Sequence, residues 1–238
     1  MNKEQFIAET KKLGINLTEE QLNKLDQFYN LLIEWNEKIN LTRITTKEDV
    51  YLKHFYDSLT LAKVIDLSTK ETLCDVGTGA GFPGIPMAIM YPEKNFVLLD
   101  SLQKRLNIIN QLCNECDILN VTTLHMRAED AGRSSLYREH FDLCVSRAVA
   151  PLNVLSELCI PLVRNGGYFF AYKGPGVSDE IDDAKKAIYV TGGSIIEVRN
   201  VQPVDLMSNH NIVIIRKERF TAPAYPRKAG LPNKKPIV

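Results

Sequence analysis

A short loop in which glycine alternates with other residues is the part of the sequence best suited to hold a ligand. Asp75 ends an apolar run, and Gly77, Gly79 and Gly81 follow it at every second position. Glycine lacks a Cβ, so its backbone can adopt positive φ and approach a bound molecule closely. A helical apolar pattern begins near Phe82. The loop therefore joins a strand to a helix N-terminus, whose free N–H groups suit an anionic or carboxylate-bearing ligand.

The glycine spacing by itself leaves the kind of ligand open. A dinucleotide fingerprint requires G-x-G-x-x-G, in which the third glycine packs the helix against the strand. Counted from Gly77 and Gly79, that third position is Phe82, whereas counted from Gly79 and Gly81 it is Gly84. A Walker phosphate loop is excluded because no Lys-Ser or Lys-Thr pair follows. A turn without a ligand is the remaining alternative, although open α/β sheets bind ligands at this place.

Acidic residues after the next two strands narrow the ligand. Asp100 ends the apolar run 96–100, and a carboxylate there can accept hydrogen bonds from both hydroxyls of a ribose. Its alternative role is to cap the following helix. Glu129 follows the run 121–125 and can reach an adenine edge, or can simply favour the N-terminus of the next helix. Combined with the loop, these positions predict a ligand that contains a nucleoside.

Alternating strands and helices must bring these residues to one edge of a sheet. The predicted strands cover residues 72–76, 96–100, 121–125, 141–145, 168–173, 194–201 and 211–216. The predicted helices between them cover residues 82–91, 101–116, 129–137, 151–163 and 178–190. Such alternation predicts a mostly parallel seven-stranded sheet with helices on both faces. The last two strands, joined by a loop without a helix, predict a hairpin that adds one antiparallel strand.

Segments of different composition flank this core. We predict an N-terminal helical extension (1–70), a ligand-binding core (71–216) and an extended basic surface tail (217–238). In the extension, Thr18 and Gln21 predict a capping box at a helix start. The tail is rich in lysine, arginine and proline, so it should lie extended on the surface.

Composition excludes several classes of protein. Hydrophobic residues make up 45% and charged residues 24% of the 238 residues, as in ordinary soluble globular proteins. The formal net charge is zero, so nucleic-acid binding must come from a local basic patch. Without a signal-like N-terminus or a run of 18 apolar residues, the chain is predicted to be cytoplasmic and independent of membranes. The Cys113–Cys116 spacing lies within a helical pattern and lacks a second pair, so we predict no metal site.

The order of these features resembles that of class I S-adenosylmethionine-dependent methyltransferases. Asp75 with the glycine loop, Asp100 and the Ala128–Glu129 pair stand after successive strands, as in that class. Longer strings resemble the bacterial glucose-inhibited-division protein B family over essentially the whole chain. They are WNEKINLT (35–42), HFYDS (54–58), DVGTGAGFPGIP (75–86), SRAVA (146–150) and YPRK (225–228). Members of that family are small-subunit (16S) ribosomal RNA methyltransferases that methylate N7 of one guanine.

The resemblance implies a Rossmann-like fold, S-adenosylmethionine as cofactor, and small-subunit ribosomal RNA or the ribosomal subunit as partner. The implied cofactor-binding residues are Gly77, Gly79, Gly81, Phe82, Asp100, Ala128, Glu129 and Arg147. In this assignment the loop lines the methionine and ribose parts, Asp100 holds the ribose hydroxyls, and Ala128 and Glu129 meet the adenine. Arg147 belongs to the cofactor site and can also face the substrate.

The reaction that the resemblance implies needs little from the protein beyond positioning. Guanine N7 presents a lone pair and carries no proton, so in-line attack on the methyl group requires no general base. We therefore assign no catalytic residue. Substrate-side contacts are expected from Arg147, His54 and Lys173, although a packed role suits His54 better than an acid–base role. The predicted RNA-binding residues are Arg227, Lys228, Lys234 and Lys235, with a merely solvated tail as the alternative.

Other functions remain open at this point. One is methyl transfer to a different substrate, against which the basic tail and the whole-chain resemblance argue. Another is a nicotinamide-dependent oxidoreductase, which Phe82 in the first glycine register disfavours. A third is a non-catalytic cofactor-binding RNA assembly factor. The intact glycines, Asp100 and Glu129 argue that cofactor binding is retained, without proving turnover.

Overall fold

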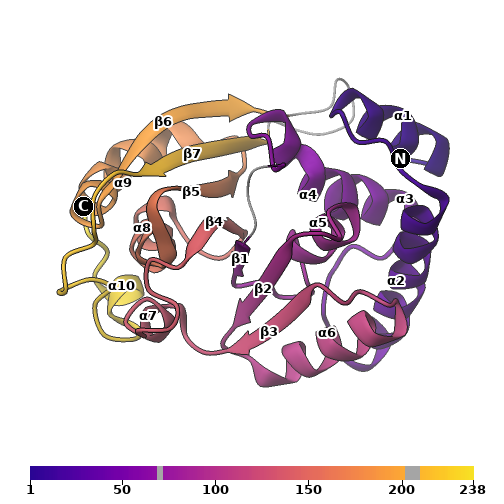
Figure 1. Ribbon diagram of the computed structural model, residues 1–238, viewed down its shortest axis with the longest axis horizontal. Coiled ribbons are helices and arrows are strands. Elements are labelled where there is room, and N and C mark those ends of the chain that lie inside the picture. Colours follow the sequence, from indigo (N-terminus) through magenta and orange to yellow (C-terminus); the bar gives the residue numbers. More distant parts are fainter. Residues whose placement is uncertain (69–71, 202–209) are drawn as a thin grey trace.

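A seven-stranded sheet crosses the molecule in the order β3-β2-β1-β4-β5-β7-β6 (Figure 1). This computed structural model describes residues 1–68, 72–201 and 210–238. The strands are β1 (Thr72–Val76), β2 (Asn95–Asp100), β3 (Val121–His125), β4 (Phe141–Arg147), β5 (Val163–Lys173), β6 (Gly193–Asn200) and β7 (Asn211–Lys217). The strands β1 to β5 pair in parallel, and β7 is antiparallel to both β5 and β6. The predicted fold class is therefore confirmed.

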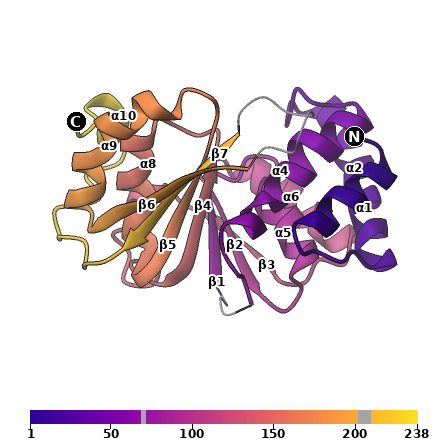
Figure 2. The ribbon, with the colours of Figure 1, turned by 90° about the horizontal axis from the view of Figure 1, so that it is seen from above.

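Helices cover both faces of the sheet (Figure 2). Their bounds are α1 (Lys3–Lys12), α2 (Glu19–Lys38), α5 (Gly84–Met90), α6 (Gln103–Glu115), α8 (Leu152–Cys159) and α9 (Val177–Val190). One face packs against α8 and α9, and the other against α5 and α6, outside which α1 and α2 form a further layer. The N-terminal helices thus share a core with the sheet, in which Phe28 and Phe55 lie fully buried with Leu106 of α6.

The second helix begins as its sequence predicts. Thr18 Oγ1 accepts a hydrogen bond from Gln21 N–H at 3.2 Å, and Gln21 Oε1 accepts one from Thr18 N–H at 3.0 Å, which completes the predicted capping box. The Gln21 amide also donates to the carbonyls of Ile89 and Met90, at the end of α5, at 3.2 Å each. The cap therefore also fixes α2 against the core.

A chain of short helical turns connects this layer to the sheet. It consists of α3 (Lys47–Asp49), a π-helix (Val50–Tyr56), α4 (Asp57–Leu59) and a 3₁₀-helix (Thr60–Lys63). The sequence predicts one helix here that opens at Thr46, and the Thr46 hydroxyl does cap it. The π-helical part was not predicted. Such segments occur often at functional sites, and this one carries His54.

Two predictions differ from the structure, namely the helix at 129–137 and the fully extended tail. The predicted helix 129–137 is wrong, because only α7 (Ala128–Ala131) forms. The segment after α7 turns instead, and Arg138 in it donates to the carbonyls of Gly132 and Thr221 at 2.7 and 2.5 Å. Contact with the tail shapes this segment, which a local pattern cannot encode. In the tail itself, residues 218–230 have neither helix nor strand, but α10 (Leu231–Lys234) follows them.

Some predictions fall outside the described residues. These are the loop between the last two strands, at 202–209, and the boundary at residue 70.

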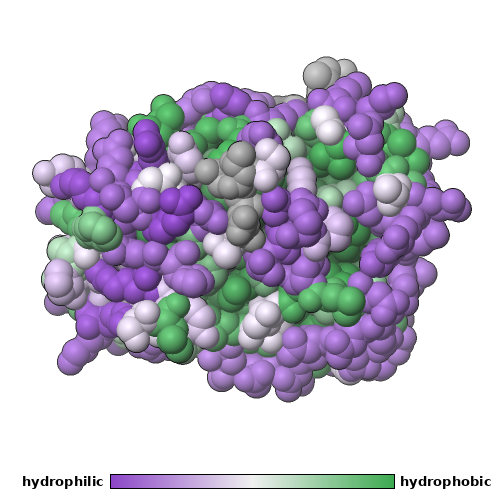
Figure 3. Space-filling model, in the orientation of Figure 1, coloured by the Kyte–Doolittle hydropathy of each residue, from purple (hydrophilic) through white to green (hydrophobic). Residues whose placement is uncertain are grey.

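Hydrophilic residues dominate the face in Figure 3, with hydrophobic residues in small groups among them. In the described ranges, no helix is both long and apolar enough to cross a membrane.

Candidate functional site

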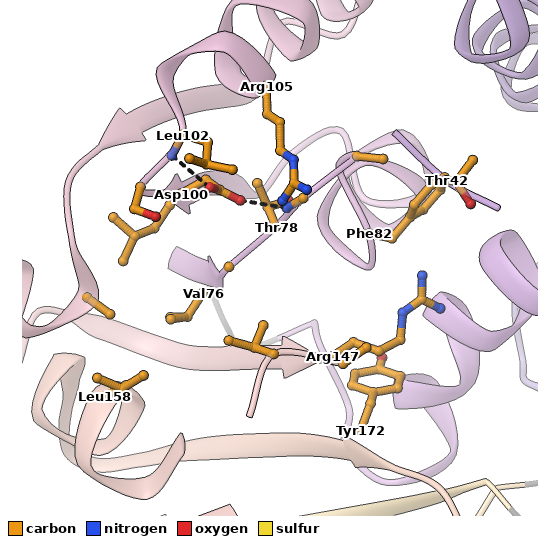
Figure 4. Close-up of a pocket in the computed structure, with 18 of the residues that line it drawn as sticks. Thr42, Val76, Thr78, Phe82, Asp100, Leu102, Arg105, Arg147, Leu158 and Tyr172 are labelled. Atoms are coloured by element: carbon orange, nitrogen blue, oxygen red, sulfur yellow. Dashed lines mark hydrogen bonds between the residues drawn. The ribbon is translucent and has the colours of Figure 1, made fainter. Parts of the chain in front are cut away.

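A cavity of about 1000 Å³ opens at the carboxyl ends of the parallel strands (Figure 4). This is where open α/β sheets bind ligands. The glycine loop after β1 and the ends of β2, β4 and β5 line it, together with residues of the N-terminal extension and of the tail. Asp100 and Leu158 lie at one end, whereas Thr42, Phe82 and Arg147 lie at the other (Figure 4).

Most predicted cofactor residues meet in this cavity. It is lined by Gly77, Gly79, Phe82, Asp100, Ala128, Glu129 and Arg147, and also by His54 and Lys173. Gly81 belongs to the loop but does not line the cavity. Several lining residues were missed by the sequence analysis, namely Thr42, Asp57, Arg105, Arg127, His210 and Asn233. Of these, Thr42 and Asp57 lie within strings that carried the family resemblance, which was the one signal available for them.

The loop adopts the backbone conformation that its glycines permit. Gly77, Gly79 and Gly81 have φ of +73°, +60° and +93°. Gly84, at the start of α5, has a different task, because a Cβ there would lie 2.2 Å from Leu98 Cδ2. Gly84 thus packs the helix against the sheet, as the second glycine register predicts.

Asp75 stabilises the glycine loop through two hydrogen bonds. Its Oδ2 accepts hydrogen bonds from Thr78 Oγ1 at 2.7 Å and from Gly84 N–H at 2.9 Å. Its Oδ1 has no hydrogen-bond partner among the described residues. Burial raises the pKa of this carboxyl from 3.8 to about 6, although the two hydrogen bonds oppose the rise. The loop is therefore braced by a carboxyl that titrates near neutrality.

This shifted pKa predicts an unusual pH dependence of stability. Because the folded pKa of Asp75, about 6, lies above its ordinary value of 3.8, folding favours the protonated form. The free energy of unfolding that Asp75 contributes is then complete below pH 3.8 and is lost as pH rises through 6. Relative to an Asp75→Asn variant, the wild type should lose on the order of 2–3 kcal/mol across this window. Urea unfolding of both proteins at pH 4 to 7 measures it, and a constant difference would contradict the shifted pKa.

Asp100 also stabilises the glycine loop, and its carboxylate oxygens can still accept hydrogen bonds from a ligand. Its Oδ2 accepts from Gly79 N–H and its Oδ1 from Leu102 N–H, both at 2.9 Å (Figure 4). Leu102 is the N-cap of α6, which has no side-chain cap, so Asp100 fixes the turn before the helix and does not cap the helix itself. Each carboxylate oxygen has two lone pairs. One acceptor site therefore remains on each oxygen, which matches two ribose hydroxyls.

Arg147 organises the other end of the cavity. Its Nη1 donates to the Lys53 carbonyl at 3.1 Å and to Asp57 Oδ2, and its Nη2 donates to His54 Nδ1 at 3.2 Å. The guanidinium lies 5.5 Å from the centre of the Phe82 ring. These bonds occupy three of its five N–H groups. The Nε–H and one Nη2–H remain available to a negatively charged ligand such as a carboxylate.

His54 is held as a neutral ring. It stacks on Phe82 with ring centres 4.2 Å apart, and its Nε2 lies 2.8 Å from Thr42 Oγ1. Burial, assisted by the charge of Arg147, lowers the pKa of His54 to about 3. Because Nδ1 accepts from Arg147, we assign the proton to Nε2, which donates to Thr42. The ring therefore has no free lone pair for a proton from a substrate.

Asp57 is likewise fully engaged. Its side chain is 2% exposed, and its Oδ1 accepts from His210 Nδ1 at 2.8 Å while Arg147 binds Oδ2. Burial alone would raise the pKa of Asp57, but the hydrogen bond from His210 and the charge of Arg147 hold it below its usual range. This buried carboxylate joins the N-terminal extension to β4.

The basic residues predicted to contact substrate or RNA differ in whether their side chains are already bound within the protein. Lys173 lines the cavity wall, but its Nζ donates to the Ala150 carbonyl at 2.8 Å and to Glu180 at 2.7 Å. Arg227 lies outside the cavity and is bound by buried Glu157 at 2.6 Å. Within the described part of the chain, the exposed side chains of Lys228, Lys234 and Lys235 have no acidic partner.

Comparisons with known proteins agree with the resemblance. The sequence model of the GidB family, described as rRNA small subunit methyltransferase G, matches residues 21–208. A ribosomal RNA small subunit methyltransferase G from Bacillus cytotoxicus is 48% identical, over 100% of this chain and 99% of that relative. One from Exiguobacterium sibiricum is 45% identical over 100% of both chains. Aeropyrum pernix fibrillarin, solved with natively bound S-adenosyl-L-methionine, shares the fold at a TM-score of 0.51, with 15% identity over 66% of this chain and 72% of that one.

Proposed function

Because the chain belongs to the rRNA small subunit methyltransferase G family, we propose that it transfers the methyl group of S-adenosylmethionine to N7 of one guanine in small-subunit ribosomal RNA. The observation that carries this proposal is the convergence of the glycine loop, Asp100 and Arg147 on one cavity at the carboxyl edge of the sheet. The partner in this proposal is the RNA or the ribosomal subunit in the cytoplasm. Family membership excludes the nicotinamide-dependent alternative.

The residues present fit S-adenosylmethionine. Asp100 has one free acceptor site on each oxygen for the ribose hydroxyls, beside the Gly79 N–H that it already binds. The two free N–H groups of Arg147 suit the methionine carboxylate. Ala128 and Glu129 line the cavity where α7 begins, as the adenine assignment requires. The cofactor, when bound, supplies a methyl group on a positively charged sulfur.

The protein's part in catalysis is to hold guanine N7 in line with the methyl group and to exclude water. A guanine N7 needs no proton removed, and neither His54 nor Asp57 is free to act as a base, because Arg147 and Thr42 engage His54 and Arg147 and His210 engage Asp57. The stack of His54 on Phe82 makes a rigid wall beside Arg147. Such fixed geometry can supply much of the barrier reduction.

Transfer of a labelled methyl group tests the proposal. Small-subunit RNA from cells that lack this methylation is offered as naked RNA, as an assembling particle and as the mature subunit. We expect incorporation into RNA in at least one of these forms. Cofactor binding without any incorporation would favour the assembly factor, and label in ribosomal protein would favour a different substrate.

The free lysines of the tail should contribute to RNA affinity by neutralising phosphates. Replacing Lys234 and Lys235 with alanine is expected to weaken RNA binding. It should also lower the slope of log K against log salt by about 0.7–0.9 for each phosphate that is no longer neutralised. Filter binding at several salt concentrations measures both quantities. The Lys11→Ala, Lys12→Ala pair on α1, on the other side of the sheet, is the matched control (Figure 2). Equal slopes for the two variants would make the tail lysines irrelevant to RNA.

A further inference from the structure

Residues 218–234 of the tail form a strap that lies against α7 and α8 and ends at the cavity. Figure 1 shows α10 beside α7, and α10 also packs on α8. Glutamates of the core bind the strap at three points along its length. Glu139 accepts from Thr221 N–H at 2.6 Å, Glu157 from Arg227 N–H at 2.7 Å, and Glu129 from Gly230 N–H at 2.7 Å. The strap is thus fixed to the core and is not a solvated tail.

The central anchor is a buried ion pair. Glu157 in α8 is 1% exposed, and besides the Arg227 N–H it accepts from the Arg227 guanidinium at 2.6 and 2.9 Å. A buried carboxylate is costly without its partner. The pair therefore fixes where the following residues of the strap lie, including Gly230 and α10.

The end of the strap reaches the part of the cavity assigned to adenine. Glu129 lines the cavity and holds Gly230, and Asn233 lies three residues further along and lines the same cavity. Leu158 of α8, against which α10 packs, also lines it. The Asn233 side chain has no hydrogen-bond partner in the described ranges. Its amide therefore has two donors and an acceptor available for a ligand.

We propose that Asn233 binds the adenine of the cofactor and that the Arg227–Glu157 pair positions it, so that the tail forms one wall of the cofactor site. An asparagine amide can pair with the amino group and ring nitrogen of adenine at once, by donating to the nitrogen and accepting from the amino group. This role rests on the proposed function, which requires an adenosine-containing cofactor. It also gives the tail a task that its basic residues do not suggest.

Calorimetric titration of the full chain with two ligands tests the proposal without relying on activity. The ligands are S-adenosylhomocysteine and its inosine analogue, in which oxygen replaces the adenine amino group. The wild type should prefer the adenosine compound. Asn233→Ala should lose about 10-fold in affinity for it and much less for the inosine compound, so the preference disappears. Asn114→Ala, exposed on α6, is the matched control.

The outcomes separate the two proposals. Wild-type affinities for both ligands in Asn233→Ala would remove this residue from the site, and an equal loss for both would make the strap a structural element without a role in recognition. A wild type that binds neither ligand would instead overturn the proposed cofactor.

The positioning role of Arg227 has its own readout, which is the ratio of the two affinities. Arg227→Met combined with Glu157→Gln removes the ion pair without leaving a buried unpaired carboxylate. The preference for the adenosine compound should fall as in Asn233→Ala. Retention of that preference, with only the thermal stability lowered, would contradict positioning by this pair.

Discussion

Arg147→Ala is expected to destabilise the protein by about 3–5 kcal/mol and to abolish methyl transfer. The stability loss follows because Asp57, whose side chain is 2% exposed, would keep its charge without its main cationic partner. Transfer should fail because the same change removes the guanidinium N–H groups proposed to hold the cofactor and the bond that orients His54. Urea unfolding and labelled-methyl transfer measure the two effects.

A double variant separates stability from function. Arg147→Met with Asp57→Leu removes both charges, so it should be markedly more stable than Arg147→Ala and yet remain inactive. Arg147→Lys keeps a charge but loses the planar fork, and it should retain part of the stability. If the double variant were as unstable as Arg147→Ala, the buried ion pair would not be the cause of the loss.

Asp100→Ala is expected to weaken cofactor binding by on the order of 1–3 kcal/mol, about 5- to 150-fold in dissociation constant. Asp100 is 6% exposed, and its carboxylate stabilises the loop through Gly79 N–H and has one free acceptor site on each oxygen for the ribose. Calorimetric titration with S-adenosylmethionine measures the change, and circular dichroism verifies that the fold is retained.

Two further variants make this measurement specific. Asp183→Ala, exposed on α9, should bind the cofactor as the wild type does. Asp100→Asn keeps one acceptor oxygen but loses the charge, so its affinity should lie between those of the wild type and Asp100→Ala. Unaltered affinity in Asp100→Ala would place Asp100 outside the site and leave it only its hydrogen bonds to Gly79 N–H and Leu102 N–H.

The sheet and its glycine loop could be predicted from sequence because their signals are local. Two of the strands, β1 and β3, occupy the predicted residues 72–76 and 121–125, since short apolar runs end at turn residues there. Asp100 could be identified as a candidate for the same reason, because it ends such a run. The place of these residues at one sheet edge then follows from the parallel topology.

What the sequence could not predict depends on contacts between distant residues. Arg147 meets Asp57 and His54 across about 90 positions of the chain. No local pattern reveals that the N-terminal extension closes the cavity. The tail's composition also does not show that Glu157 of the core binds the Arg227 guanidinium. Arg227 is one of the residues that the sequence predicts to bind RNA. Its role in RNA binding stays a prediction.

Identification of the methylated nucleoside tests the central claim most directly. Small-subunit RNA that lacks the modification is incubated with the protein and labelled S-adenosylmethionine. One part of the product is digested to nucleosides, which identifies the labelled base, and another part to nuclease fragments, whose masses locate it in the RNA. The account predicts label in 7-methylguanosine at a single position, with none from the Arg147→Met, Asp57→Leu variant. Label in any other nucleoside, or in 7-methylguanosine at many positions, would contradict it.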